Sequence, residues 1–186
     1  METADSAYAS QDNRSDELLA IRCQLGESAA FDALIRKWAP PLQRYLLRVS
    51  HDQDIAQDLM QEVWLSVLRG IGALADCAKL RQWLFSIAHR CLMARLRSQY
   101  RLQIDPDISL DQLVDASDDS AHEDTRSMVL GGLALLPGAE REVLSLFYLQ
   151  ELPLAEIASV LAVPVGTVKS RLFRARNLLR EQLMIA

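Results

Sequence analysis

The sequence predicts an all-α protein, with two small helical domains joined by a flexible acidic linker. Half of its 186 residues are hydrophobic, yet only 6% are aromatic and only 7 are glycine, which favours helices over sheets. On both sides of a central acidic stretch, apolar residues recur at intervals of three and four, the spacing of a helix that buries one side. The acidic stretch has few apolar residues, so we expect it to connect two domains without packing into either.

The first part of the chain is expected to hold two helices. Residues 1–14 are polar and predict a disordered N-terminus. Ser15 is placed to cap a first helix that ends at Gly26, and a second helix is expected over residues 28–48. Because proline lacks an N–H and clashes with the preceding turn, the Pro-Pro pair at positions 40–41 is expected to kink or split this second helix.

A third helix is expected to begin at Ser50 or Asp52 and to end at Gly70. Its buried side is predicted to carry four aliphatic residues at helical spacing, namely Ile55, Leu59, Val63 and Val67. A separate stripe is formed by Asp54, Asp58, Gln61 and Leu65, with Glu62 beside it. Spacing alone favours the simplest interpretation of this stripe, which is an acidic face in contact with water.

A loop over residues 70–79 leads into a fourth helix over residues 80–101. Its core stripe is predicted to consist of Leu80, Leu84, Ile87, Ala88 and Cys91. Between residues 77 and 104 the chain has no acid but six cations, which are Lys79, Arg81, Arg90, Arg95, Arg97 and Arg101. Trp83 shares a stripe with three of these arginines, and cations beside an aromatic ring suit a single-stranded nucleic acid. A core position for Trp83 is an equally good interpretation.

Between residues 102 and 125 the charge of the chain changes from basic to acidic. This segment has no Lys or Arg but eight acids, which are Asp105, Asp107, Asp111, Asp115, Asp118, Asp119, Glu123 and Asp124. With Pro106 and few apolar residues, it is predicted to be a flexible linker. It separates a domain over residues 15–101 from a second domain over residues 126–186.

The second domain ends in two helices with a sharp turn between them, over residues 151–183. Pro153 and Pro164 each suit the first turn of a helix. The longer helix is predicted to bury Val165, Val168, Leu172, Ala175 and Leu179. Its opposite face would carry Thr167, Ser170, Arg174 and Asn177, flanked by Lys169, Arg171 and Arg176. Because residues 157–180 carry only basic charges, we favour a DNA-binding helix-turn-helix over a two-helix hairpin with a solvated basic face.

Composition also limits the classes of function. The net charge is −5, but the cations are segregated from the acids, so nucleic-acid binding stays open. Three widely spaced cysteines without a CxxC pair (Cys23, Cys77 and Cys91) predict reduced thiols and neither a disulfide framework nor a metal site. We find no signal peptide or spanning segment and therefore expect a cytoplasmic protein without membrane insertion. No nucleophile–base set or glycine-rich phosphate loop appears, so we expect no enzyme and no cofactor.

Four motifs together resemble one protein family. They are DIAQDLMQEVW (residues 54–64), LRQWLFSIAHR (80–90), LALLPGAEREVLSLFYLQELPLAEIASVL (133–161) and VPVGTVKSRLFRAR (163–176). In these motifs and their order the chain resembles bacterial RNA polymerase sigma factors of the extracytoplasmic-function type, which retain only conserved regions 2 and 4. The alternative is a helix-turn-helix regulator whose N-terminal domain binds an effector or dimerises.

The resemblance implies a role for each surface. Residues 15–101 would be region 2, and its third helix would dock on the clamp helices of the largest polymerase subunit through Asp54, Asp58, Gln61 and Glu62. The loop over residues 70–80 would hold a base flipped from the non-template strand. The minus-10 element would be engaged by Lys79, Arg81, Trp83, Arg90, Arg97 and Arg101.

Residues 126–186 would be region 4, with the minus-35 element read by Thr167, Lys169, Ser170, Arg171, Arg174 and Arg176. The acidic linker would run toward the RNA exit path. The implied partners are core RNA polymerase (clamp helices and flap region), promoter DNA and a cognate anti-sigma factor. The polymerase would supply all bond formation, so the resemblance implies no catalytic residues here.

The chain departs from the family pattern at one point of the fourth helix. Family members commonly read IARN followed four residues later by Asp, whereas this chain reads IAHR over residues 87–90 and then Ala94. Arg90 and Ala94 replace a hydrogen-bonding and anionic pair with a cation and a methyl group. We expect this change to make the helix seek phosphates more strongly.

Overall fold

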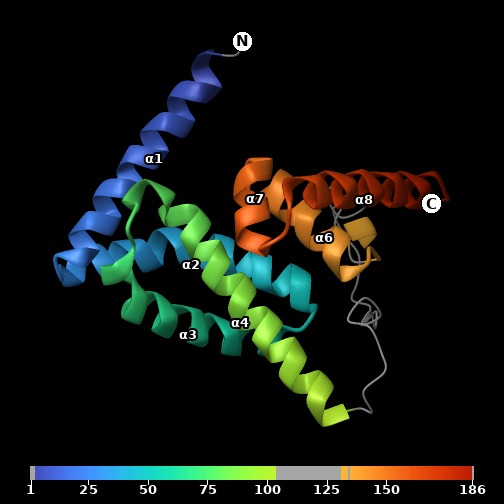
Figure 1. Cartoon of the computed structure of the whole chain (residues 1–186), viewed down its shortest axis with the longest axis horizontal. Coiled ribbons are helices and arrows are strands. Elements are labelled where there is room, and N and C mark those ends of the chain that lie inside the picture. The colour runs from blue at the N-terminus through green and yellow to red at the C-terminus, as the bar shows by residue number, and fades with distance from the viewer. Residues whose placement is uncertain (1–2, 104–130, 134, 186) are drawn as a thin grey trace.

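The computed structural model describes the backbone of residues 3–103, 131–133 and 135–185, and the side chains of residues 14–98, 131–133 and 135–181. Every regular element in these ranges is a helix (Figure 1). The N-terminal half contains α1 (Thr3–Gln24), α2 (Ser28–Ser50), α3 (Gln53–Gly70), the short 3-10 helices η1 (Ile71–Ala73) and η2 (Cys77–Lys79), and α4 (Leu80–Gln103). The C-terminal half contains α6 (Gly138–Leu144), the π-helix η4 (Ser145–Leu149), α7 (Leu154–Leu161) and α8 (Val165–Ile185). The eight linker acids lie outside the described residues.

The N-terminal half is a bundle in which α2 packs against α1, α3 and α4. Each helix contributes an apolar stripe, and the fully buried residues include Leu34, Leu42, Tyr45, Leu46, Leu59, Val63, Leu84 and Leu92. Phe85 lies at their centre, where its ring meets Trp38 at 6.3 Å and Tyr45 at 5.5 Å in edge-to-face geometry. Such aromatic pairs contribute about 1 kcal/mol beyond the burial of their area.

The predicted ends of α3 are confirmed. The side chain of Asp52 accepts a hydrogen bond from the backbone N–H of Ile55 at 2.9 Å, so Asp52 and not Ser50 is the N-cap. The helix ends at Gly70, as expected, but Gly70 is not a left-handed cap, because the chain continues directly into η1. A Cβ atom on Gly70 would lie 3.2 Å from Cζ2 of Trp83, so the lack of a side chain lets the indole pack closely.

One expectation about the first helices is wrong, and one of the two alternatives of another is excluded. Helix α1 begins at Thr3 and not at Ser15. The added segment contains three alanines and no proline or glycine, and alanine has the highest helix propensity. Helix α2 is not split by the Pro-Pro pair but runs through it. The local cost of proline in a helix, about 3 kcal/mol, is outweighed by packing of the buried Trp38 and Leu42 on either side.

The helix-turn-helix is present, with α7 and α8 as its two helices. Ala162 ends α7 in the left-handed conformation at φ 54°, and the N–H of Val163 donates to the carbonyl of Ala158 at 3.0 Å. Val168, Leu172 and Ala175 are buried as predicted. Val165 is 39% exposed, contrary to prediction, because the first residue of a helix projects beyond the surface on which the later turns pack. On the N-terminal side of the helix-turn-helix, α6 is followed directly by the π-helix η4.

The two halves pack against each other. Helix α7 lies on α4, while α6 and η4 contact α2 (Figure 1). The buried residues of α7, including Ile157 and Leu161, belong to the same continuous hydrophobic core as those of the N-terminal bundle. A smaller cluster, formed by Leu133, Leu136, Leu144 and Ala175, joins α6 to α8. Among the described helices, none is both long and apolar enough to cross a membrane.

Candidate functional site

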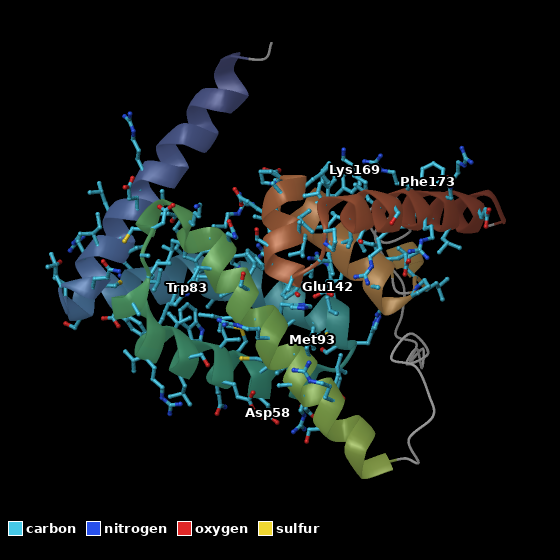
Figure 2. The ribbon with its side chains drawn as sticks, in the orientation of Figure 1. Asp58, Trp83, Met93, Glu142, Lys169 and Phe173 are labelled. Atoms are coloured by element: carbon cyan, nitrogen blue, oxygen red, sulfur yellow. The ribbon has the colours of Figure 1, made fainter. Side chains whose placement is uncertain are left out.

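The acidic face of α3 lies on the outside of the bundle. Its four predicted residues, Asp54, Asp58, Gln61 and Glu62, are all exposed. The opposite side of the helix carries Ala56, Leu59, Val63 and Val67, which are buried, whereas Ile55, which was predicted to be buried, is only partly buried. Figure 2 shows Asp58 at the outer edge of α3. Leu65 and Leu68, 51% and 58% exposed, extend the face with apolar surface, so it offers both negative charge and hydrophobic contact.

The loop between α3 and α4 is closed by local polar contacts. The side chain of Asp76 caps η2 by accepting from the N–H of Ala78 at 3.2 Å, and it pairs with Lys79 at 3.0 Å. The hydrogen bond from Lys79 lowers the pKa of Asp76, so this carboxylate remains charged at neutral pH. Lys79 is therefore held at the start of α4 with its charge exposed.

The residues of α4 that were predicted to contact DNA differ in how far they are exposed. Arg90 and Arg97 are exposed, and Nε of Arg90 donates to the carbonyl of Ser86 at 3.3 Å. Arg81 is half-buried, and the side chain of Arg101 lies outside the described residues. Trp83 is half-buried and packs against the core, with Cζ2 of its ring close to Gly70. Both of its predicted roles are thus compatible with its position.

The outer face of α8 presents the predicted cations of the second domain. Lys169, Ser170, Arg174 and Arg176 are exposed, whereas Thr167 and Arg171 are half-buried. Arg174 lies 3.5 Å from Glu140, and the guanidinium of Arg176 stacks over Phe147 and Tyr148 at 5.7 and 5.5 Å. Sequence reasoning missed Phe173, which is 66% exposed beside these cations (Figure 2). Its signal was an aromatic residue outside the buried stripe.

A buried polar cluster, also missed, lies where the two halves meet. Glu142 of α6 is only 5% exposed. Its Oε1 accepts a hydrogen bond from the hydroxyl of Tyr45 and lies 2.8 Å from Nδ1 of His89 on α4 (Figure 2 labels Glu142 between the halves). Burial raises the pKa of Tyr45 well above its usual range, and the Glu142 carboxylate raises it further, so the hydroxyl stays protonated and donates.

Arg141, next to Glu142, is also buried at this junction. Its Nη2 donates to the carbonyl of Leu136 at 2.8 Å, and its Nη1 reaches the carbonyl of Arg48 at 3.5 Å. Burial lowers the pKa of Arg141 to about 10. The available signal in the sequence was a run of three charges, residues 140–142, at the start of an otherwise apolar helix. Such a run predicts partners, but it does not say which ones.

Comparison with known proteins decides the family. Residues 34–102 match the family described as Sigma-70 region 2, and residues 127–179 match Sigma-70, region 4. The chain is 30% identical to the RNA polymerase sigma-H factor of Pseudomonas aeruginosa over 180 residues, covering 90% of this chain and 93% of that protein. It is 31% identical over 169 residues to the ECF RNA polymerase sigma factor SigM of Mycobacterium tuberculosis, covering 91% and 85%. The chain belongs to the extracytoplasmic-function sigma factors.

Solved structures share the fold of this sigma factor. CnrH in complex with the cytosolic domain of CnrY superposes with a TM-score of 0.66 at 22% identity, covering 91% of this chain and 97% of that chain. The sigma factor RpoE in complex with the anti-sigma factor NepR from Bartonella quintana gives a TM-score of 0.67 at 22% identity, covering 83% and 97%. The prediction of an all-α protein with two sigma domains is confirmed. A sigma factor directs RNA polymerase to promoters and is not an enzyme, so the alternative of another helix-turn-helix regulator is not favoured.

Proposed function

We propose that this sigma factor binds core RNA polymerase through the acidic face of α3, formed by Asp54, Asp58, Gln61 and Glu62. The observation that carries the proposal is that all four side chains are exposed on one side of a helix whose other side is core. Within the described part of the chain, none of the three acids forms an ion pair. Folding alone gives no reason for this concentration of negative charge, whereas a basic partner surface does.

The two DNA surfaces lie on α4 and α8 in this proposal. Region 2, residues 15–101, would engage the minus-10 element through Lys79, Arg81, Trp83, Arg90, Arg97 and Arg101. Region 4, residues 126–186, would engage the minus-35 element through Thr167, Lys169, Ser170, Arg171, Arg174 and Arg176. Support comes from the exposure of Arg90 and Arg97 on α4 and of Lys169 on α8. Residues 102–125 would be the acidic linker between the regions.

The packed arrangement of the halves would be the state of the protein away from DNA. The minus-35 and minus-10 elements lie about 25 base pairs apart, which is about 85 Å of duplex at 3.4 Å per pair. Helix α7 packs directly on α4 here, so the two regions must separate before both elements can be read. Separation would expose the apolar surfaces of α4 and α7 to a partner. We infer that the protein acts in the cytoplasm, where core polymerase and a cognate anti-sigma factor compete for its packed and separated states.

The polymerase surface can be tested by charge reversal. Asp58→Lys with Glu62→Lys should leave the melting temperature nearly unchanged, because exposed charges contribute less than about 1 kcal/mol. The double variant should nevertheless fail to co-purify with core polymerase. Asp32→Lys with Glu181→Lys changes the net charge equally at exposed positions elsewhere and should still bind. Equal binding by both double variants would contradict the assignment.

A further inference from the structure

One side chain of α1 contacts the loop between α3 and α4 at three points. Gln24 is the last residue of α1. Its Nε2 donates to the carbonyl oxygens of Ile71 at 3.0 Å and Leu74 at 2.8 Å, and its Oε1 accepts from the thiol of Cys77 at 3.5 Å. The carboxamide thereby connects the first 3-10 turn of the loop to the second.

The position of Gln24 is fixed by the way α1 ends. Gly26 adopts a left-handed conformation at φ 81°, and its N–H donates to the carbonyl of Cys23 at 3.0 Å. The N–H of Glu27 donates to the carbonyl of Arg22 at 3.2 Å, and the side chains of these two residues form an ion pair at 2.7 Å. This pair of backbone bonds is a Schellman motif, which sets the end of the helix and so aims the Gln24 side chain at the loop.

The other polar contacts of the loop are short-range. Asp76 fixes the second turn through Ala78 and Lys79, but these contacts do not determine how far that turn lies from the first. The thiol of Cys77 can serve as a donor because desolvation raises its pKa and keeps it protonated. Gly72, Ala73, Ala75 and Asp76 are exposed, and Gln24 is exposed as well, so the hydrogen bonds between Gln24 and the loop lie near the surface.

We propose that Gln24 is a positioning residue for promoter recognition, holding residues 71–79 in the shape that receives a flipped base. The inference rests on the minus-10 role proposed above for this loop. A loop that is ordered before binding loses less conformational entropy when a base enters it, so binding is tighter. Gln24 makes no contact with the base in this scheme. It acts through the carbonyls of Ile71 and Leu74, which it keeps a fixed distance apart.

The first test measures the loop in the full chain without DNA. Gln24→Met keeps the length of the side chain but removes its hydrogen bonds. In hydrogen–deuterium exchange, the amides of Leu74, Ala78 and Lys79 should exchange about 5- to 20-fold faster than in the wild type, as expected for the loss of one or two hydrogen bonds. Gln43→Met, at an exposed position of α2, is the matched control and should exchange like the wild type. Unchanged exchange in Gln24→Met would overturn the inference.

The second test uses holoenzyme assembled from the full chain and core RNA polymerase. The probe is a 12-nucleotide single-stranded DNA selected from a random pool by wild-type holoenzyme, together with derivatives that carry one abasic site at each position in turn. Gln24→Met should weaken binding of the intact probe by about 5- to 20-fold. It should have no further effect on the derivative that lacks the captured base. Gln24 is proposed to strengthen binding only through capture of that base, so its contribution disappears when the base is absent.

The outcomes of the second test separate two failures. If Gln24→Met weakens the intact and abasic probes equally, or neither of them, Gln24 does not act through base capture and the inference is wrong, while the proposed minus-10 role stands. If wild-type holoenzyme binds every abasic derivative as tightly as the intact probe, the proposed role of the loop fails, and the inference fails with it. The exchange experiment still reports whether Gln24 orders the loop.

Discussion

The acids of α3 and the acids of α6 have the same chemistry but opposite environments. Asp54, Asp58 and Glu62 on α3 are exposed, whereas Glu140 and Glu142 on α6 are 8% and 5% exposed. Both sets of acids are carried by α-helices. The difference is that α3 lies at the edge of its bundle, while α6 lies where the two halves of the molecule meet.

This contrast separates acids that we propose to bind a partner from acids that stabilise the fold. A carboxylate that leaves water loses several kcal/mol of solvation unless hydrogen bonds replace it. Glu142 obtains these bonds from Tyr45 and His89, which belong to the other half of the chain. It is therefore satisfied only while the halves are packed together. The acids of α3 have no such requirement and remain available to another protein.

The largest expected effect follows from removing Glu142. Glu142→Ala should lower the free energy of unfolding by about 3 kcal/mol, because it leaves the buried hydroxyl of Tyr45 and the ring of His89 without their acceptor. Glu62→Ala should lower it by less than about 0.5 kcal/mol. Urea unfolding followed by tryptophan fluorescence measures both values. Similar losses for the two variants would erase the distinction between the two sets of acids.

A second comparison separates base contacts from phosphate contacts on α8, using Arg174, the ion-pair partner of Glu140, and Lys169. Arg174→Ala should relax base preference at the upstream element, at a cost of about 1–3 kcal/mol if the guanidinium makes a bidentate base contact. Lys169→Ala should weaken binding to all sequences and reduce the slope of log affinity against log salt by about one. Binding of holoenzyme to a promoter library at several salt concentrations distinguishes them. Identical profiles would show that the division into base and phosphate contacts is wrong.

The smallest expected effect concerns the pH dependence of stability at His51, whose pKa is influenced by Arg141 at the junction of the two halves. Burial lowers the pKa of His51 below its ordinary 6.5, and Arg141 lowers it further. The unfolded chain therefore binds this proton more readily, so stability is full above about pH 6.5 and is lost as the pH falls through the folded pKa. His51→Asn removes this group and tolerates the left-handed backbone at φ 56°.

The measurement is the melting temperature between about pH 7.5 and about pH 5.5. The wild type should lose more stability over this range than His51→Asn. Carboxylates elsewhere titrate in both proteins and cancel in the difference. Parallel curves would mean that His51 takes up its proton equally in the folded and unfolded chains.

Much of the local structure followed from the sequence. The end of α3 at Gly70 and the buried stripe of Val168, Leu172 and Ala175 were predicted from capping residues and helical spacing, and the start of α3 was narrowed to Ser50 or Asp52. The outward acidic face of α3 was predicted by the same spacing. The motifs for regions 2 and 4 identified the family, because motifs are recognised from the order of residues along the chain and do not require the packing to be known.

Tertiary structure decided which helices meet and which polar groups become partners. Helical periodicity shows which side of a helix is apolar, but it does not show which helix that side covers. Tyr45 and Glu142 are 97 residues apart, so no local pattern joins them. Gln24 likewise looked like an ordinary residue at a helix end, and only the packing of α1 beside the loop brings its carboxamide to Ile71 and Leu74. Packing of the buried neighbours Trp38 and Leu42 likewise keeps α2 continuous through its two prolines, where the sequence alone predicts a kink or a break.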